Sequence, residues 1–406
     1  MTGLRPLSRR VGVLMLVAAG AGAAVALLTT PGSRRALPPG GSRFGTATGR
    51  ATRHESLIDA LAPLLAAGNS RRAPATGSGV TLSLARGVGQ LFAVGVSGTK
   101  ADAATLARVR LHDWGAVVLG RGNYVSPAQV SQLVAAIDAA ARAAGNDPPL
   151  VIARQGGGDS SAFPGLAPAS EPELGAVGRG DLVSGQAQLA ARELRALHVN
   201  ATLAPVADLG DLAGPAQGRA YADDPRKVAV LTRAAVQGYR RGGLLSIVSH
   251  FPGEGAASQD PGAGPATVGL HLSDLLARDV VPFRAVVDIA PMIQMSNALY
   301  AAFDGVTPAS LLPDAVSLLR ERLGYRGVIV SGDLSPATLA TGGTVAQAAV
   351  AALRAGDDLL YVNDPARATA AYDAVLIAIR DHGLDAATIA RSIARVVAIK
   401  RAYQIR

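Results

Sequence analysis

Eight short apolar runs constrain the fold of this chain more than any other feature of its sequence. Runs of this length, bounded by Gly, Pro or polar residues, are typical of buried strands, and the segments between them carry apolar residues at helical spacing. Strand then helix, eight times over, predicts a (β/α)8 barrel of the TIM type, while a doubly wound open sheet remains the alternative. The runs are Leu91–Val96, Ala116–Leu119, Leu150–Ala153, Ala201–Ala204, Leu245–Val248, Met292–Ser296, Val328–Ser331 and Leu359–Val362.

The barrel accounts for most of the chain. We expect it to span residues 79–406 as a single domain, because a barrel of this class needs about 250 residues. Apolar residues at helical spacing from Ile389 to Lys400 predict a last helix that completes the outer ring. Residues 31–78, rich in Gly, Pro, Arg and Ser, predict a flexible tether.

Residues 1–30 predict a signal sequence or a membrane anchor. Three arginines precede an uncharged apolar run, Val11–Leu28, which ends shortly before Pro31. The run is at the lower limit for a bilayer-spanning helix and is longer than the apolar part of most signal peptides. We therefore favour an anchor, with secretion after cleavage as the alternative. The basic flank would stay in the cytoplasm and place the rest of the chain outside the membrane.

Composition excludes several classes of function. The net charge of +9 comes from arginine, but aromatic residues make up only 4% of the chain, so we expect no nucleic-acid partner. There is no cysteine, which excludes disulfides and a lipid-modified cysteine. The six histidines lack the spacing of metal ligands, and we expect neither a metal nor a cofactor.

The segment after the fifth run, Ser249–Gly255, places a histidine and a glutamate beside a Pro-Gly turn. In parallel α/β folds, the loops that leave the carboxyl ends of the strands hold the chemistry. His250 therefore marks a candidate pocket, although the residues alone also allow a structural histidine.

This segment belongs to a wider resemblance. From about Leu82 onward the chain resembles the N-terminal, barrel-forming domain of glycoside hydrolase family 3, in particular its β-N-acetylhexosaminidase branch. That family usually has Lys-His-Phe-Pro-Gly-His-Gly followed by Asp-Ser/Thr-His, whereas this chain has Ser-His-Phe-Pro-Gly-Glu-Gly and then Asp-Pro-Gly. The resemblance implies a site for N-acetylglucosamine-containing cell-wall glycan. Gly262 stands at the position of the family's proton-donating histidine, and Glu254 is the only obvious substitute acid, expected to be an ordinary exposed glutamate.

The family's nucleophile is also replaced. It is the Asp of Ser/Thr-Asp-x-Leu after the seventh strand, and Gly332 aligns with it in the segment 331–334, Ser-Gly-Asp-Leu. Asp333 lies one residue further on, and because side chains alternate along a strand, we expect it to point elsewhere unless the glycine re-aims the loop. On the sixth strand, Asn297 stands where the family has a histidine.

Two family residues for ligand binding are kept. By the resemblance, Arg219 binds the ligand, and Asp208 ends the family's Ala-Pro-Val-x-Asp segment after the fourth strand. The residues alone equally allow Arg219 to pair with Asp223 or Asp224, two acids that suit the start of a helix.

At a third position the charge of the side chain is opposite to that in the family. Arg154 stands where the family has an Asp that binds a sugar hydroxyl. It would either attract an anionic ligand or form a salt bridge with Asp159 or Asp208.

These changes favour a family member that has lost its activity and binds cell-wall glycan or a protein partner. The loss of one member of a catalytic set is severe, and here several are altered. The alternative is an active β-N-acetylglucosaminidase that uses Asp333 with Glu254 or His250.

Overall fold

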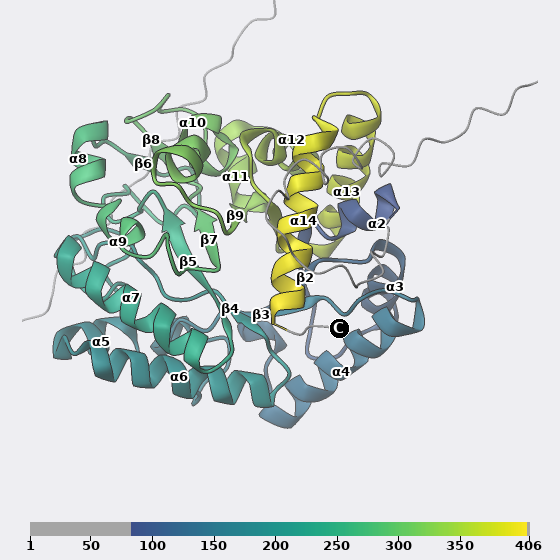
Figure 1. Cartoon of the computed structure of the whole chain (residues 1–406), viewed down its shortest axis with the longest axis horizontal. Coiled ribbons are helices and arrows are strands. Elements are labelled where there is room, and N and C mark those ends of the chain that lie inside the picture. Colours follow the sequence, from purple (N-terminus) through teal and green to yellow (C-terminus); the bar gives the residue numbers. More distant parts are fainter. Residues whose placement is uncertain (1–82, 404–406) are drawn as a thin grey trace, which may run out of the picture. The chain divides into compact units, whose positions relative to one another are not determined.

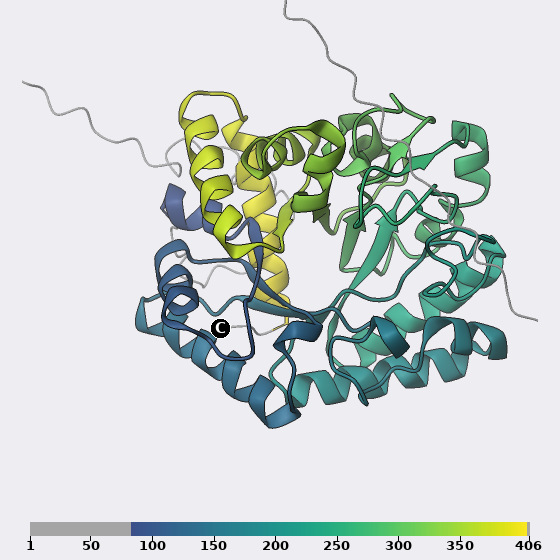
Figure 2. The same ribbon diagram turned by 180° about the vertical axis from the view of Figure 1, so that it is seen from behind.

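The computed structural model describes residues 83–403, and within them eight parallel strands close into a barrel in the order β1-β10-β9-β7-β5-β4-β3-β2 (Figures 1 and 2). Each of the eight predicted runs supplies one strand, so the (β/α)8 barrel is confirmed and the open sheet is excluded. The strands are β1 (Phe92–Gly95), β2 (Ala116–Leu119), β3 (Leu150–Ala153), β4 (Ala201–Thr202), β5 (Leu245–Phe251), β7 (Met292–Met295), β9 (Val328–Asp333) and β10 (Leu359–Val362).

Helices occupy the segments between the strands, and several begin at the residues that favour a helix start. Asp224 accepts a hydrogen bond from the backbone N–H of Lys227 and is followed by Pro225, which confirms its role as a cap. The helices are α2 (Leu84–Gly89), α3 (Ala103–His112), α4 (Pro127–Ala143), α5 (Glu171–Val177), α6 (Gly180–Ala196), α7 (Pro225–Arg241), α8 (Leu272–Ala277), α9 (Val281–Arg284), α10 (Pro313–Ser317), α11 (Leu334–Thr341), α12 (Val345–Ala355), α13 (Pro365–Arg380) and α14 (Ala386–Ala402).

The barrel interior is filled by side chains. In β2, Ala116 and Val118 belong to the interior cluster, while Val117 and Leu119 pack against the surrounding helices. This alternation follows from the two-residue period of a strand, with both faces buried. The interior is thus a packed core that leaves room for a ligand only at an open end.

The sequence predicted that the last helix completes the outer ring. This prediction was wrong for α14. Its Val396 belongs to the barrel-interior cluster, and Lys400 donates to Oε1 of Gln90, just before β1, at 2.8 Å. Arg395 donates to Asp358, just before β10. The helix therefore covers the end of the barrel at which the strands begin. It is the yellow helix labelled α14 in Figure 1. An apolar stripe shows that a helix is buried but not against which surface.

The long loops after β5 and β7 are joined by a small sheet of β6 (Thr267–Val268) and β8 (Leu299–Tyr300). These loops lie at the carboxyl ends of the strands, opposite α14.

Within residues 83–403, no helix is both long and apolar enough to cross a bilayer. The predicted anchor, Val11–Leu28, and the predicted tether, residues 31–78, lie outside the described residues.

Candidate functional site

A cavity of about 860 Å³ opens at the carboxyl ends of the strands. This volume is in the range of small-molecule binding sites. Five of the six predicted site residues line it, namely Arg154, Arg219, His250, Glu254 and Asp333, and the sixth, Asp208, contacts His250. The structure thus brings the sequence-predicted residues to one place.

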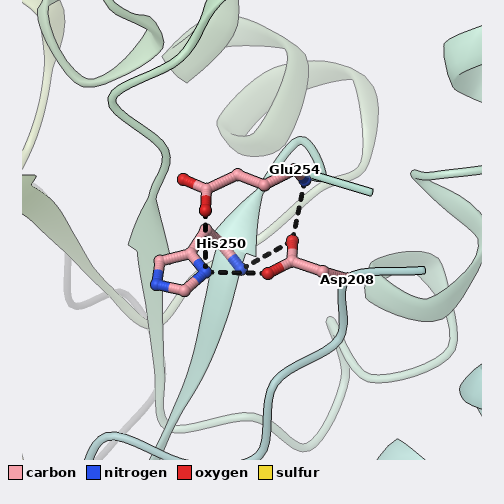
Figure 3. A group of neighbouring side chains, drawn as sticks. All are labelled: Asp208, His250 and Glu254. Atoms are coloured by element: carbon pink, nitrogen blue, oxygen red, sulfur yellow. Dashed lines mark hydrogen bonds and ion pairs between the residues drawn. The ribbon is translucent and has the colours of Figure 1, made fainter. Parts of the chain in front are cut away.

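Asp208 organises one wall of this cavity (Figure 3). The carboxylate is fully buried, and its Oδ2 lies 2.8 Å from Nδ1 of His250. Its Oδ1 accepts hydrogen bonds from the backbone N–H groups of His250, at 3.3 Å, and Glu254, at 2.8 Å. One carboxylate therefore fixes both the imidazole ring and the loop that follows β5.

The electrostatics of this wall favour a charged pair. Burial would raise the pKa of Asp208, but the charge and hydrogen bond of His250 outweigh it and leave that pKa below its ordinary value. Burial would lower the pKa of His250, but the carboxylates of Glu254 and Asp208 outweigh it and raise that pKa. Both shifts favour the ionised form of the aspartate and the protonated form of the histidine. The second ring nitrogen of His250 points away from both carboxylates (Figure 3).

Glu254 is buried, with 3% of its surface exposed, so the expectation of an ordinary exposed glutamate was wrong. Its Oε1 accepts a hydrogen bond from Oγ of Ser296 at 2.8 Å, and its Oε2 accepts one from Arg219 at 3.0 Å. Burial raises the pKa of Glu254 above its ordinary value, although His250 and Arg219 oppose the shift. The sequence did not indicate this burial, because Ser296 and Arg219 are 42 and 35 residues away along the chain.

Arg219 pairs with neither Asp223 nor Asp224, the two partners that the residues alone allowed. It lies 3.0 Å from Glu254 and 3.7 Å from Asp260. Its buried Nε has no hydrogen-bond partner among the described residues. The guanidinium thus joins the two acids of the loop after β5, and Asp260 has a cationic partner.

The space beside Gly332 is occupied. A Cβ added at Gly332 would lie 2.2 Å from Oδ1 and 2.5 Å from Cγ of Asn297. The Asn297 side chain is held there, because its Nδ2 donates to the backbone carbonyl of Asp333 at 2.6 Å and its Oδ1 accepts from Oγ of Ser310 at 2.6 Å. The Asn297 side chain therefore fills the space that any side chain at Gly332 would need.

Asp333 lines the cavity, but its carboxylate is engaged with the backbone. Its Oδ1 accepts hydrogen bonds from the N–H groups of Ser335, at 3.1 Å, and Asn363, at 3.2 Å, and the first of these caps α11. Burial raises the pKa of Asp333. Gly332 lies within β9 without a left-handed backbone, so no glycine turn accounts for this position, and the carboxylate has a structural role as the cap of α11.

Arg154 is exposed in the cavity, and the predicted pairing with Asp159 or Asp208 was wrong. Among residues 83–403, no carboxylate oxygen lies within 4.0 Å of its guanidinium nitrogens. Its charge acts on Asp333 and on the Tyr361 hydroxyl, which both line the same cavity.

Asp208, His250 and Glu254 also have the proximity that a metal site requires, since one ligand atom of each lies within 4.8 Å of the others. Spacing along the sequence could not reveal this group, because 42 residues separate Asp208 from His250. However, Arg219 lies 3.0 Å from Glu254, and a metal ion bound there would have to displace this cation. The charges present favour the ion-pair cluster over a metal centre.

Curated proteins similar to this chain are described as beta-hexosaminidases. That of Xanthomonas campestris pv. campestris is 35% identical over 289 residues, which are 68% of this chain and 85% of the relative. That of Methylococcus capsulatus is 34% identical over 263 residues, which are 63% of this chain and 77% of the relative.

Solved structures agree with these relatives. A family 3 β-N-acetylglucosaminidase from Paenibacillus sp. str. FPU-7 has a TM-score of 0.74 and 30% identity, covering 80% of this chain. The match spans 63% of that protein, less than two thirds of its length. A β-N-acetylhexosaminidase from Beutenbergia cavernae has a TM-score of 0.71 and 29% identity, covering 79% of this chain and 99% of that one.

The family model described as the glycosyl hydrolase family 3 N-terminal domain matches residues 83–399, which include the whole barrel and every residue of the cavity. This chain therefore belongs to glycoside hydrolase family 3.

Proposed function

We propose that the barrel binds an N-acetylhexosamine-containing glycan in the cavity and does not hydrolyse it by the route of retaining glycosidases. The observation that carries this proposal is the side chain of Asn297, which fills the space beside Gly332. The relatives described as β-hexosaminidases support the ligand class.

The retaining route needs two carboxyl groups about 5 to 5.5 Å apart, one as nucleophile and one as proton donor. At the aligned nucleophile position this chain has a glycine without room for a side chain. Asp333, the nearest acid along the chain, accepts two backbone hydrogen bonds through Oδ1, which reduces its nucleophilicity. Neither Gly332 nor Asp333 thus supplies a carboxylate that is placed and free to attack.

Sugar binding asks less of the cavity than hydrolysis does. It needs fixed polar groups that exchange hydrogen bonds with hydroxyl and amide groups. His250 and Arg219 line the cavity, and buried carboxylates hold both in place. These supports fix the side chains before a ligand arrives, which lowers the entropic cost of binding.

One observation favours the second candidate function, an active β-N-acetylglucosaminidase with relocated carboxylates. Glu254 is buried and its pKa is raised, which is the state that a general acid requires near neutral pH. It lines the same cavity as Asp333. This candidate function requires the Asp333 side chain to release its hydrogen bonds at the start of α11 when the substrate binds.

We expect the full-length protein to release no chromophore from 4-nitrophenyl N-acetyl-β-glucosaminide and to bind N-acetylglucosamine in calorimetry. His250→Ala should weaken this binding by about tenfold or more, because a charged hydrogen-bond donor is lost. His271→Ala is the matched control, since His271 is exposed and lies outside the cavity wall.

Two results would contradict this proposal. If the wild type releases the chromophore and Asp333→Ala or Glu254→Ala does not, the protein is an active hydrolase. Absence of any heat with N-acetylglucosamine would instead favour a protein partner as the ligand of the barrel.

We further propose that the protein is exported and held at the membrane by Val11–Leu28. This proposal is supported by the basic residues that precede the uncharged apolar run. The full chain should then sediment with membranes, resist extraction at alkaline pH and be cut by protease added outside the membrane. A variant that lacks residues 1–30 should stay in the cytoplasmic fraction. Recovery of the full chain in the cytoplasm would contradict export.

A further inference from the structure

Four side chains that can carry a positive charge line the cavity, and the ion pairs are distributed unevenly among them. Three have a carboxylate partner: Arg219 lies 3.0 Å from Glu254, Arg367 lies 3.1 Å from Asp364, and His250 lies 2.8 Å from Asp208. Within residues 83–403, Arg154 is the one member of the four without such a partner inside 4.0 Å. Its charge is available to a ligand.

The position of Arg154 is set by the barrel. The residue follows β3 directly, and its backbone is paired on both sides: its N–H donates to the carbonyl of Leu119, and its own carbonyl accepts from the N–H of Ala162. Its side chain passes Gly120, where an added Cβ would lie 3.9 Å from Cδ of the arginine. The guanidinium is thus presented by rigid backbone at the end of a strand, as a built binding site requires.

Asp333 does not neutralise this charge by direct contact. Its Oδ1 accepts the two backbone hydrogen bonds described above, which hold the carboxylate at the start of α11. Burial raises the pKa of Asp333, and the Arg154 charge only partly offsets this. The guanidinium can therefore release its hydration water and bind the anionic group of a ligand.

We propose that Arg154 binds a carboxylate carried by the glycan, so that the cavity selects acidic sugars over neutral ones. A planar guanidinium offers two parallel N–H donors, which match the two oxygens of a carboxylate. The ligand class is then a uronic acid or an N-acetylhexosamine with an acidic ether substituent. This inference rests on the proposed binding of sugar and adds the charge of the ligand to it.

The test is calorimetry on the full-length protein with two matched pairs of probes. N-acetylmuramic acid is compared with N-acetylglucosamine, and glucuronic acid is compared with glucose. At least one acid should bind roughly 10- to 100-fold more tightly than its neutral counterpart, the gain expected of a charge-assisted hydrogen-bond pair. This preference should shrink between about 0.05 M and about 0.5 M salt, because the arginine is exposed.

The variant Arg154→Gln should bind the acid and the neutral sugar equally well. Arg367→Gln is the matched control, because Arg367 lines the same cavity but is paired with Asp364, and it should keep the preference. Arg154→Lys should keep only part of it, since the charge remains but the planar pair of donors is lost.

The outcomes separate this inference from the proposed function. Equal binding of acid and neutral sugar by the wild type would overturn the role of Arg154 and leave sugar binding intact. A preference that survives Arg154→Gln would also overturn it. Inorganic phosphate that binds as tightly as the acids would show a general anion site, which contradicts selection of acidic sugars. No binding of any sugar would overturn both proposals.

Discussion

Replacing Gly332 with aspartate, which restores the residue of the family's nucleophile, is expected to destabilise the barrel by about 3 to 5 kcal/mol and to leave it without turnover. The added Cβ would lie 2.2 Å from Oδ1 of Asn297, far inside van der Waals contact. Asn297 cannot move aside without losing its hydrogen bonds to Ser310 and to the backbone of Asp333. Overpacking and the loss of these bonds both contribute to the cost, and urea denaturation measures it.

The double variant Gly332→Asp/Asn297→Ala identifies the cause of this loss. If Asn297 is the obstacle, removing its side chain should recover most of the stability, and the two substitutions should be strongly non-additive. Gly332→Asp/Asn363→Ala is the matched control, because Asn363 also lines the cavity but the three atoms nearest to the added Cβ all belong to Asn297. A single variant Gly332→Asp as stable as the wild type would contradict the argument.

The contrast between the fold and the cavity shows what the sequence could predict. Three runs, at Ala116–Leu119, Leu150–Ala153 and Leu359–Val362, have the same bounds in the structure as in the sequence. They are buried on both faces, so apolar content alone marks where they begin and end. β5 and β9 instead continue to Phe251 and Asp333, because backbone pairing continues past the point where the apolar pattern stops.

The site could be located from the sequence, but its ion pairs could not. The carboxyl ends of parallel strands lie at the same end of a barrel, so the sequence predicts that residues such as His250 and Asp333 lie close together. The partner of Arg219 depends instead on how two loops, 35 residues apart, pack together. The same is true of the burial of Glu254, which raises its pKa. Sequence reasoning therefore predicts which residues meet but not how their charges are shared.

Replacing Asp208 with alanine is expected to cost about 3 to 5 kcal/mol of stability, because it leaves the charge of His250 without its closest partner in a buried site. It also removes the acceptor for the backbone N–H groups of His250 and Glu254. Binding of N-acetylglucosamine should fall by about tenfold or more, because the imidazole is no longer held in place. Denaturation and calorimetry on the purified variant measure the two effects.

The pH dependence of this loss tests the charge of His250. The folded-state pKa of His250 is raised above the ordinary 6.5, so its contribution to stability is fully present below that pH and is lost as the pH rises through the raised value. The pKa of Asp208 is lowered below 3.8, so its contribution is present above that pH. The difference between the wild type and Asp208→Ala should therefore be larger at about pH 5.5 than at about pH 8.5.

Asp288→Ala is the matched control for this experiment. It removes an exposed aspartate whose partner, Arg233, does not lose its charge in this range. Its smaller cost, about 1 kcal/mol or less, should be the same at both pH values. If Asp208→Ala also costs the same at both, His250 is neutral in the folded protein. Asp208 would then orient the ring without stabilising a charge, and the cavity would have one cation fewer to offer a ligand.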